Sequence, residues 1–265
     1  MPEDAVIERL IPGERGDEGL LQRHLAAYAF VVQETPAVTL ALDCGCGIGY
    51  GAHILAWHCG PTVGLDRECE ALHEARRRYP GPLGHVCGDA QGLPFADGAF
   101  DLVVSSQVLE HAADPEAFCG ELRRVCAPGG KAIIAVPNRL TQAPGEFLSS
   151  ECHAREFGPD DLWNLLRRHF GALRPYGTFP GPRMARFENA DTWARRLVAR
   201  DRLGLRRLAP RGLRRWLLRR LRGPQQAVAP PALPTDLLTH YDRECYVVTT
   251  GPLEEALDLV AVCRP

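Results

Sequence analysis

One stretch, residues 42–50, constrains the fold more than any other, because glycine occupies every second position in the middle of its sequence LDCGCGIGY. An apolar run at 38–41 precedes this stretch, and a helical pattern at 52–56 follows it. Glycine adopts backbone conformations that other residues resist, and it allows a ligand to approach the backbone closely. The first turn of a helix offers N–H groups and a partial positive charge. The stretch therefore predicts a strand, a tight turn and a helix that hold a nucleotide- or carboxylate-bearing ligand.

The spacing of these glycines distinguishes between several kinds of ligand-binding turn. A dinucleotide-binding turn has the pattern G-x-G-x-x-G, and a phosphate-binding P-loop ends in Gly-Lys-Ser or Gly-Lys-Thr. Here the pattern is G-x-G-x-G, and an acidic residue, Asp43, stands before the first glycine. The P-loop is excluded, and an NAD-linked oxidoreductase becomes a less favoured alternative.

Apolar strand patterns alternate with helical patterns through the middle of the chain. We expect strands at 38–43, 62–66, 83–88, 100–105 and 131–136, and helices at 50–58, 68–78 and 115–126. Such alternation is typical of a parallel sheet with helices on both faces. Ligands of such sheets bind beyond the carboxyl ends of the strands, where we expect residues 43, 66, 89 and 106.

Four further segments follow the glycine turn: a strand that ends in Asp66, the segment 88–90 (Gly-Asp-Ala), a strand and loop at 100–111, and a turn and strand at 127–137. Together they resemble the motifs of class I S-adenosylmethionine (SAM) dependent methyltransferases, in particular a bacterial type-11-like methyltransferase domain. The lead at 8–13 resembles methyltransferases linked to glycan assembly. The resemblance implies an α/β fold with a doubly wound, seven-stranded, mostly parallel sheet.

The resemblance also implies a cofactor, SAM, which leaves as S-adenosylhomocysteine (SAH). In the family, the carboxylate after the second strand binds the ribose hydroxyls, and the acid of the Gly-Asp-Ala segment lies beside the adenine amino group. The glycine turn then meets the methionine part of SAM. The residues expected to bind the cofactor are Asp43, Gly45, Cys46, Gly47, Gly49, Asp66, Arg67, Asp89, Ala90 and Gln107.

Two histidines are candidates for a catalytic base, because imidazole exchanges protons near neutral pH. His111 ends a Leu-Glu-His string after the fourth strand, and His153 belongs to an H-x-R-E-F string that ends at Phe157. Either histidine can instead orient its loop by hydrogen bonds, and Arg155 and Glu156 can pair with each other. No cluster of Asp and Asn ligands follows the fourth strand, so we do not expect a catalytic metal.

The remaining chain divides around this core. We expect an N-terminal helical lead at 1–37 with an amphipathic helix at 19–33, a SAM-binding core at 38–180, an Arg-rich helical insertion with a Pro-rich linker at 181–250, and the last strand of the core at 251–265. A helix should begin at Pro159. The last two strands of the sheet should lie at 171–179 and 256–263.

Residues 195–222 hold twelve arginines and one acid, Asp201. This segment could contact an anionic membrane surface, an acidic substrate or nucleic acid. The favoured interpretation is a solvated helix whose apolar stripe packs on the core, because charge runs usually face solvent. Nucleic acid is the less favoured partner, since base stacking needs exposed aromatic residues and the only one within the segment, Trp216, belongs to its apolar stripe.

Composition completes the prediction. The 265 residues are 45% hydrophobic and 24% charged, as in ordinary globular proteins. With no signal peptide and no long apolar run, we expect a cytoplasmic protein whose ten cysteines are buried thiols rather than disulfides or metal ligands. The expected function is methyl transfer to a small-molecule or glycan-type acceptor at oxygen; the alternatives are nitrogen or carbon methylation of a natural product, and an RNA- or membrane-associated methyltransferase. The sequence does not indicate an oligomeric state.

Overall fold

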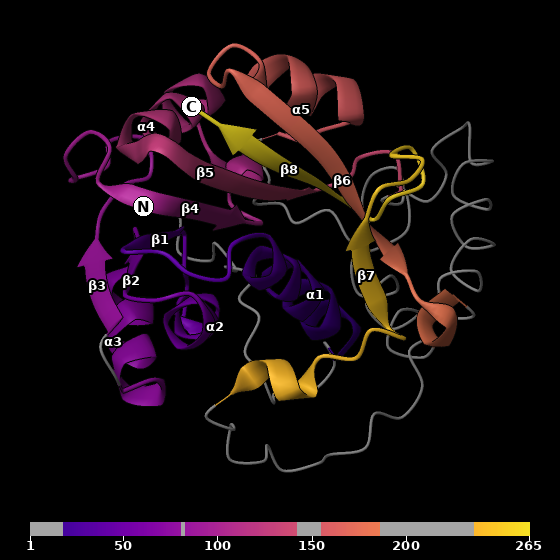
Figure 1. The fold of residues 1–265 in the computed structure, drawn as a ribbon, viewed down its shortest axis with the longest axis horizontal. Coiled ribbons are helices and arrows are strands. Elements are labelled where there is room, and N and C mark those ends of the chain that lie inside the picture. Colours follow the sequence, from indigo (N-terminus) through magenta and orange to yellow (C-terminus); the bar gives the residue numbers. More distant parts are fainter. Residues whose placement is uncertain (1–17, 81–82, 142–154, 186–235) are drawn as a thin grey trace, which may run out of the picture.

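A computed structural model describes residues 18–80, 83–141, 155–185 and 236–265. They form one eight-stranded sheet with the order β3-β2-β1-β4-β5-β8-β6-β7 (Figure 1). The strands are β1 Ala41–Cys44, β2 Thr62–Asp66, β3 Leu83–Cys87, β4 Phe100–Ser106, β5 Cys126–Pro137, β6 Ala172–Pro180, β7 Tyr246–Thr249 and β8 Asp258–Arg264. The expected arginine-rich segment at 195–222 lies outside the described residues.

The strand directions follow the expected doubly wound pattern. Strands β1 to β5 pair in parallel, whereas β8, β6 and β7 join the sheet by antiparallel pairing. The sheet has one strand more than the seven expected. The additional strand, β7, pairs with the end of β6 through Pro180 opposite Tyr246. Four residues between polar turns are too few to show a strand's alternation in the sequence.

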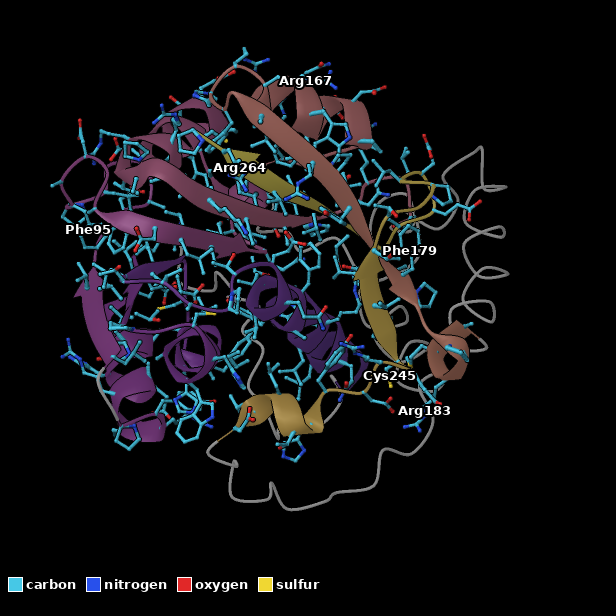
Figure 2. All side chains as sticks on the ribbon, viewed as in Figure 1. Phe95, Arg167, Phe179, Arg183, Cys245 and Arg264 are labelled. Atoms are coloured by element: carbon cyan, nitrogen blue, oxygen red, sulfur yellow. A yellow bond between two sulfur atoms is a disulfide. The ribbon has the colours of Figure 1, made fainter. Side chains whose placement is uncertain are left out.

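Both faces of the sheet are apolar, as in parallel sheets that are covered by helices on both sides. Along β5, Ile133 and Ala135 join a core cluster with residues of α1 Glu18–Glu34 and α2 Tyr50–His58. Their neighbours Ala132, Ile134 and Val136 join the opposite cluster, with residues of α4 Pro115–Val125 and α5 Pro159–Leu166. Side chains fill the space on both sides of the strands (Figure 2). The period of two along each strand produces this separation.

Local sequence explains where the helices begin. The Asp114 side chain accepts hydrogen bonds from the backbone N–H groups of Glu116 and Ala117, and Pro115 occupies the first turn of α4. Pro159 likewise stands in the first turn of α5, as expected. Other helical elements among the described residues are α3 Cys69–Arg78, two short 3-10 turns, η1 Leu109–His111 and η3 Leu237–His240, and a helical stretch at 182–185.

The N-terminal helix α1 covers one face of the sheet and spans one residue more at each end than the expected 19–33. It packs against α2, β7 and η3 (Figure 1). The Gln22 side chain fixes this position, because its Nε2 donates to the His240 carbonyl at 2.7 Å and its Oε1 accepts from the Asp242 N–H at 2.9 Å. Among the described helices, none has the length and apolar character needed to cross a membrane.

The cysteine prediction is wrong for one pair. Cys69 and Cys87 form a disulfide, with their Cα atoms 5.4 Å apart. The β2–α3–β3 crossover brings the start of α3 and the end of β3 to the same edge of the sheet, a proximity that sequence spacing does not reveal. The prediction of buried thiols is confirmed for the other described cysteines: Cys44, Cys46, Cys59, Cys119, Cys126, Cys245 and Cys263.

Candidate cofactor site

The glycine turn connects β1 to α2, and all three of its glycines have left-handed backbone conformations. At Gly45, φ is +82°, and an added Cβ would lie 2.4 Å from a methyl group of Val108, so the loop after β4 packs directly on the turn. At Gly47, φ is +54° and an added Cβ would meet no atom within 4 Å. The turn is therefore closed against the protein at one glycine and open at the next, where a ligand can approach the backbone.

Asp66 lies beside this open glycine. Its Oδ2 accepts a hydrogen bond from the Gly47 N–H at 2.8 Å, and its Oδ1 accepts from the Glu68 N–H at 2.9 Å. The half-buried carboxylate thus joins the glycine turn to the loop between β2 and α3. Its position at the carboxyl end of β2 is the one expected from the sequence.

Asp43 lies beneath the turn, and 1% of its surface is exposed. The Tyr28 hydroxyl of α1 contacts both carboxylate oxygens, at 3.0 and 3.2 Å. The pKa of Asp43 is raised to about 7, because burial and the nearby Asp66 carboxylate together outweigh the lowering by the bonds from Tyr28 and the Ala52 N–H. The carboxyl group therefore exchanges its proton near neutral pH while it supports the turn from below.

The other predicted cofactor residues near β2 and β3 differ in exposure. Cys46 is buried against Ala52 and Leu72, so its side chain belongs to the core and a ligand can reach it through the backbone. Arg67 is exposed. Asp89 is also exposed, and its Oδ1 accepts a hydrogen bond from the Gln91 N–H at 2.9 Å. The half-buried Ala90 follows Asp89 and packs against the core cluster on the α4 side of the sheet.

Gln107 follows β4 and has a φ of +59°, which is unusual for a residue with a side chain. Its N–H donates to the Ala135 carbonyl at 2.8 Å, and its Nε2 donates to Asp258 Oδ1 at 3.2 Å. Asp258 begins β8, is buried, and forms an ion pair with Arg23 of α1. One carboxylate therefore connects the loop after β4, the last strand and the N-terminal helix.

The 3-10 turn η1 carries a buried acid next to the predicted base. Glu110 is 2% exposed, and its Oε2 has no hydrogen-bond partner among the described residues. Burial raises the pKa of Glu110 to about 8, and the Asp258 charge contributes in the same direction. His111 is half-buried at the end of this turn. The other predicted base, His153, lies outside the described residues.

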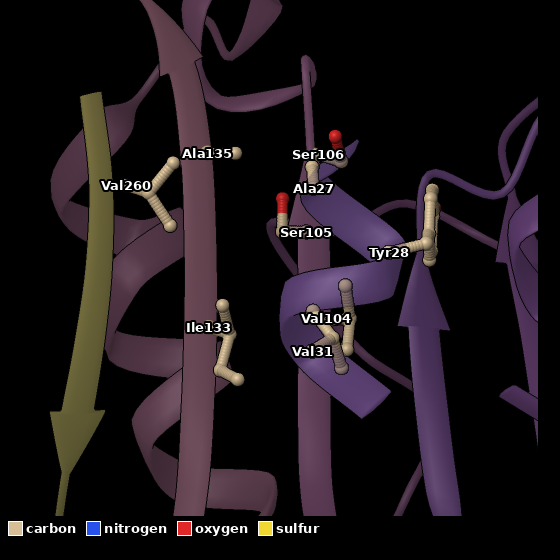
Figure 3. A pocket seen from close by; sticks show the side chains of 9 residues that line it. All are labelled: Ala27, Tyr28, Val31, Val104, Ser105, Ser106, Ile133, Ala135 and Val260. Atoms are coloured by element: carbon tan, nitrogen blue, oxygen red, sulfur yellow. The ribbon is translucent and has the colours of Figure 1, made fainter. Parts of the chain in front are cut away.

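A small cavity lies between α1 and the strands β4, β5 and β8 (Figure 3). Most of its lining is apolar, but the hydroxyl groups of Ser105 and Ser106 also face it, and neither has a hydrogen-bond partner among the described residues. These two serines are the last residues of β4 and directly precede Gln107.

Comparison with known proteins decides the family. A model described as a methyltransferase domain matches residues 42–134. A relative from Mycolicibacterium smegmatis, named a probable S-adenosylmethionine-dependent methyltransferase, is 33% identical over 184 residues, which are 68% of this chain and 70% of the relative. The chain belongs to the SAM-dependent methyltransferases.

Other relatives of this methyltransferase agree with that assignment. A probable SAM-dependent methyltransferase of Mycobacterium tuberculosis is 32% identical over 179 residues, which cover 67% of this chain and 65% of the relative. A solved Thermotoga maritima structure, described as a SAM-dependent methyltransferase and possible histamine N-methyltransferase, is 17% identical, with a TM-score of 0.59 and coverage of 93% and 92%. At this identity the structural likeness shows the fold, and the sequence relatives identify an enzyme whose methyl donor is SAM.

The structure of this methyltransferase brings the predicted residues at the ends of β1, β2 and β4 to one edge of the sheet, with Asp89 just beyond β3. Three residues in the hydrogen-bond network around them were not anticipated. Tyr28 and Arg23 come from α1, where the sequence shows an amphipathic helix and does not show which residues of the core it meets. Asp258 could have been noticed in the sequence, since it is an acid within the apolar stretch of the expected last strand.

Proposed function

We propose that this methyltransferase binds SAM across the carboxyl ends of β1 to β4. The open face of Gly47 beside the Asp66 carboxylate is the observation that carries this proposal. In this arrangement the backbone of the glycine turn holds the methionine part, Asp66 accepts the ribose hydroxyls, and Asp89 accepts the adenine amino group. Hydroxyl and amino groups match the acceptor character of the two carboxylates. Arg67 and Ala90, next to these acids, complete the adenosine side.

SAM supplies an electrophilic methyl group, so the protein must mainly place a nucleophile in line with it. Such positioning can account for roughly 7 kcal/mol or more of the barrier. The left-handed turn at Gln107 and the enclosing helix α1 support placement of the acceptor at the end of β4. His111, together with His153, remains the proposed base, and the buried Glu110 adds a group whose Oε2 can hold a proton near neutral pH.

The acceptor is proposed to be a small or glycan-type molecule methylated at oxygen. This assignment is supported by the resemblance of the N-terminal lead to glycan-linked methyltransferases. Nitrogen and carbon are the alternatives. A solved structure with the same fold, 17% identical, is a phosphoethanolamine N-methyltransferase of Haemonchus contortus with SAM, with a TM-score of 0.55 and coverage of 90% and 52%. Contact of residues 195–222 with a membrane, or with nucleic acid as the less favoured partner, belongs to the same set of alternatives.

Titration calorimetry with SAH tests the cofactor site directly. We expect Asp66→Asn and Asp89→Asn each to weaken SAH binding by about tenfold or more, because hydrogen bonds to charged groups contribute about 1.5–3 kcal/mol. Asp160→Asn, at an exposed acid in α5, is the matched control and should bind SAH as the wild type does. Binding of NADH without SAH, or unchanged SAH affinity in both variants, would contradict the proposal.

A further inference from the structure

The Cys69–Cys87 disulfide differs from the other described cysteines in its exposure. Both of its residues are exposed, whereas the seven free cysteines among the described residues are buried. Burial raises the pKa of Cys59 to about 11 and that of Cys119 to about 12, so these thiols are poor nucleophiles. Within the described part of the chain, this exposed pair is therefore the one that a thiol reagent can reach most readily.

The disulfide lies between the two acids proposed to bind adenosine. Cys69 follows Asp66 by three residues and Cys87 precedes Asp89 by two. Cys87 is the register partner of Asp66 in the parallel pair β2–β3, and the Gly88 N–H donates to the Asp66 carbonyl at 3.0 Å. One covalent bond thus fixes the loop after β2 to the loop after β3.

The backbone of Arg67 lies beside the disulfide. The sulfur of Cys87 lies 3.6 Å from the Arg67 carbonyl oxygen, and Arg67 stands between the ribose-side acid and the first residue of α3. Breaking the sulfur–sulfur bond would leave these loops joined by the remaining strand pairing and backbone hydrogen bonds. Ligand binding would then have to order groups that the disulfide holds in place, and such ordering lowers affinity.

We propose that Cys69–Cys87 is a redox modification site that sets the affinity of this methyltransferase for SAM and SAH, with the disulfide form binding more tightly. The inference rests on the proposed function, because it requires Asp66 and Asp89 to contact the adenosine part. The reaction partner is a low-molecular-weight thiol or dithiol.

The exchange balances as a two-electron reaction. A reductant thiolate attacks the Cys87 sulfur, the sulfur–sulfur bond breaks, and Cys69 leaves as a thiolate. A second reductant thiolate then attacks the reductant sulfur of the mixed disulfide and releases the Cys87 thiolate. Two reductant thiols become one disulfide, and their two protons end on the two cysteines. Cys69 is the better leaving group because it is the first residue of α3, where the helix N-terminus favours a negative charge.

The test compares SAH affinity in the two redox states of the full chain. Protein purified without reductant and protein reduced with dithiothreitol are each titrated with SAH, and alkylation with mass spectrometry verifies the state of both cysteines. We expect about 3- to 10-fold weaker binding after reduction. The variant Cys69→Ser/Cys87→Ser should bind like reduced protein and should not respond to dithiothreitol.

The possible outcomes separate this inference from the proposed function. SAH affinity that is equal in verified oxidised and reduced protein would overturn the redox site and leave the cofactor site intact. Two alkylatable thiols in protein treated with an oxidant would also overturn it, since the bond would then not form. Absence of SAH binding in every state would instead refute the proposed function.

Discussion

The hydrogen bond between Tyr28 and Asp43 leads to a prediction whose size depends on pH. Tyr28→Phe removes the hydroxyl that contacts both carboxylate oxygens and keeps the buried ring. Burial raises the pKa of Asp43 to about 7, so the carboxyl is protonated at pH 5.5 and ionised at pH 8.5. A bond to a neutral group contributes about 0.5–1.5 kcal/mol, and one to a charged group about 1.5–3 kcal/mol. We expect the variant to lose roughly 1 kcal/mol of stability at pH 5.5 and roughly 2 kcal/mol at pH 8.5.

Urea unfolding of both proteins at the two pH values measures these losses. The matched control is Tyr79→Phe, because the buried Tyr79 hydroxyl has no hydrogen-bond partner among the described residues. Burial raises the pKa of Tyr79 to about 12, so its removal should have no pH-dependent effect in this range and should cost little. An equal loss for Tyr28→Phe at both pH values would refute the reasoning, since it would mean that Asp43 does not change its charge between them.

Three further predictions concern other parts of the site. The pKa of Glu110 is raised to about 8, so the folded state keeps a proton that the unfolded chain releases near its ordinary pKa. Stability should therefore fall as the pH rises towards 8. In urea titrations Glu110→Gln should make the fall between pH 7 and 8 smaller and leave only the part due to Asp43, whose pKa is raised to about 7. Gly45→Ala should destabilise the protein by about 2–4 kcal/mol, because φ is left-handed there and the new Cβ would collide with Val108. The control is Gly92→Ala, where an added Cβ would meet no atom within 4 Å. It should change stability by less than about 1 kcal/mol in the same assay. Asp258→Asn should lower stability by roughly 2–3 kcal/mol and weaken SAH binding measured by calorimetry. The change removes the negative charge of a buried ion pair and leaves one acceptor oxygen where Arg23 and Gln107 now share two. Glu244→Gln, in an exposed pair, should lower stability by less than about 1 kcal/mol.

The sequence predicted those parts of the fold that local patterns determine. The expected strands and helices from residue 38 to 136 all occur, with ends that shift by a few residues, except that β5 already begins at Cys126. The glycine spacing predicted a tight turn after β1, and the three glycines there adopt left-handed angles, which glycine takes more readily than other residues. In each case the information lies within about ten neighbouring residues.

The missed features join residues that are far apart in the chain. The disulfide partners are separated by 18 residues, and Arg23 and Asp258 by 235. Such contacts depend on how the helices pack against the sheet, which single residues do not encode. The acid within the apolar stretch of β8 could have indicated a buried polar partner, yet its identity required the position of α1.

This contrast between local patterns and distant contacts explains why the sequence indicates the methyl donor but not the acceptor. In the proposed site, backbone geometry and acids at strand ends hold SAM, and one short motif can specify each of these features. The region proposed for the acceptor is bounded by α1, η1 and the start of β8, which come together only in the folded protein. α1 also contacts both sides, through Tyr28 to the glycine turn and through Arg23 to Asp258. A ligand that displaces α1 on the acceptor side must therefore alter SAM affinity, and SAM must alter acceptor affinity by the same factor.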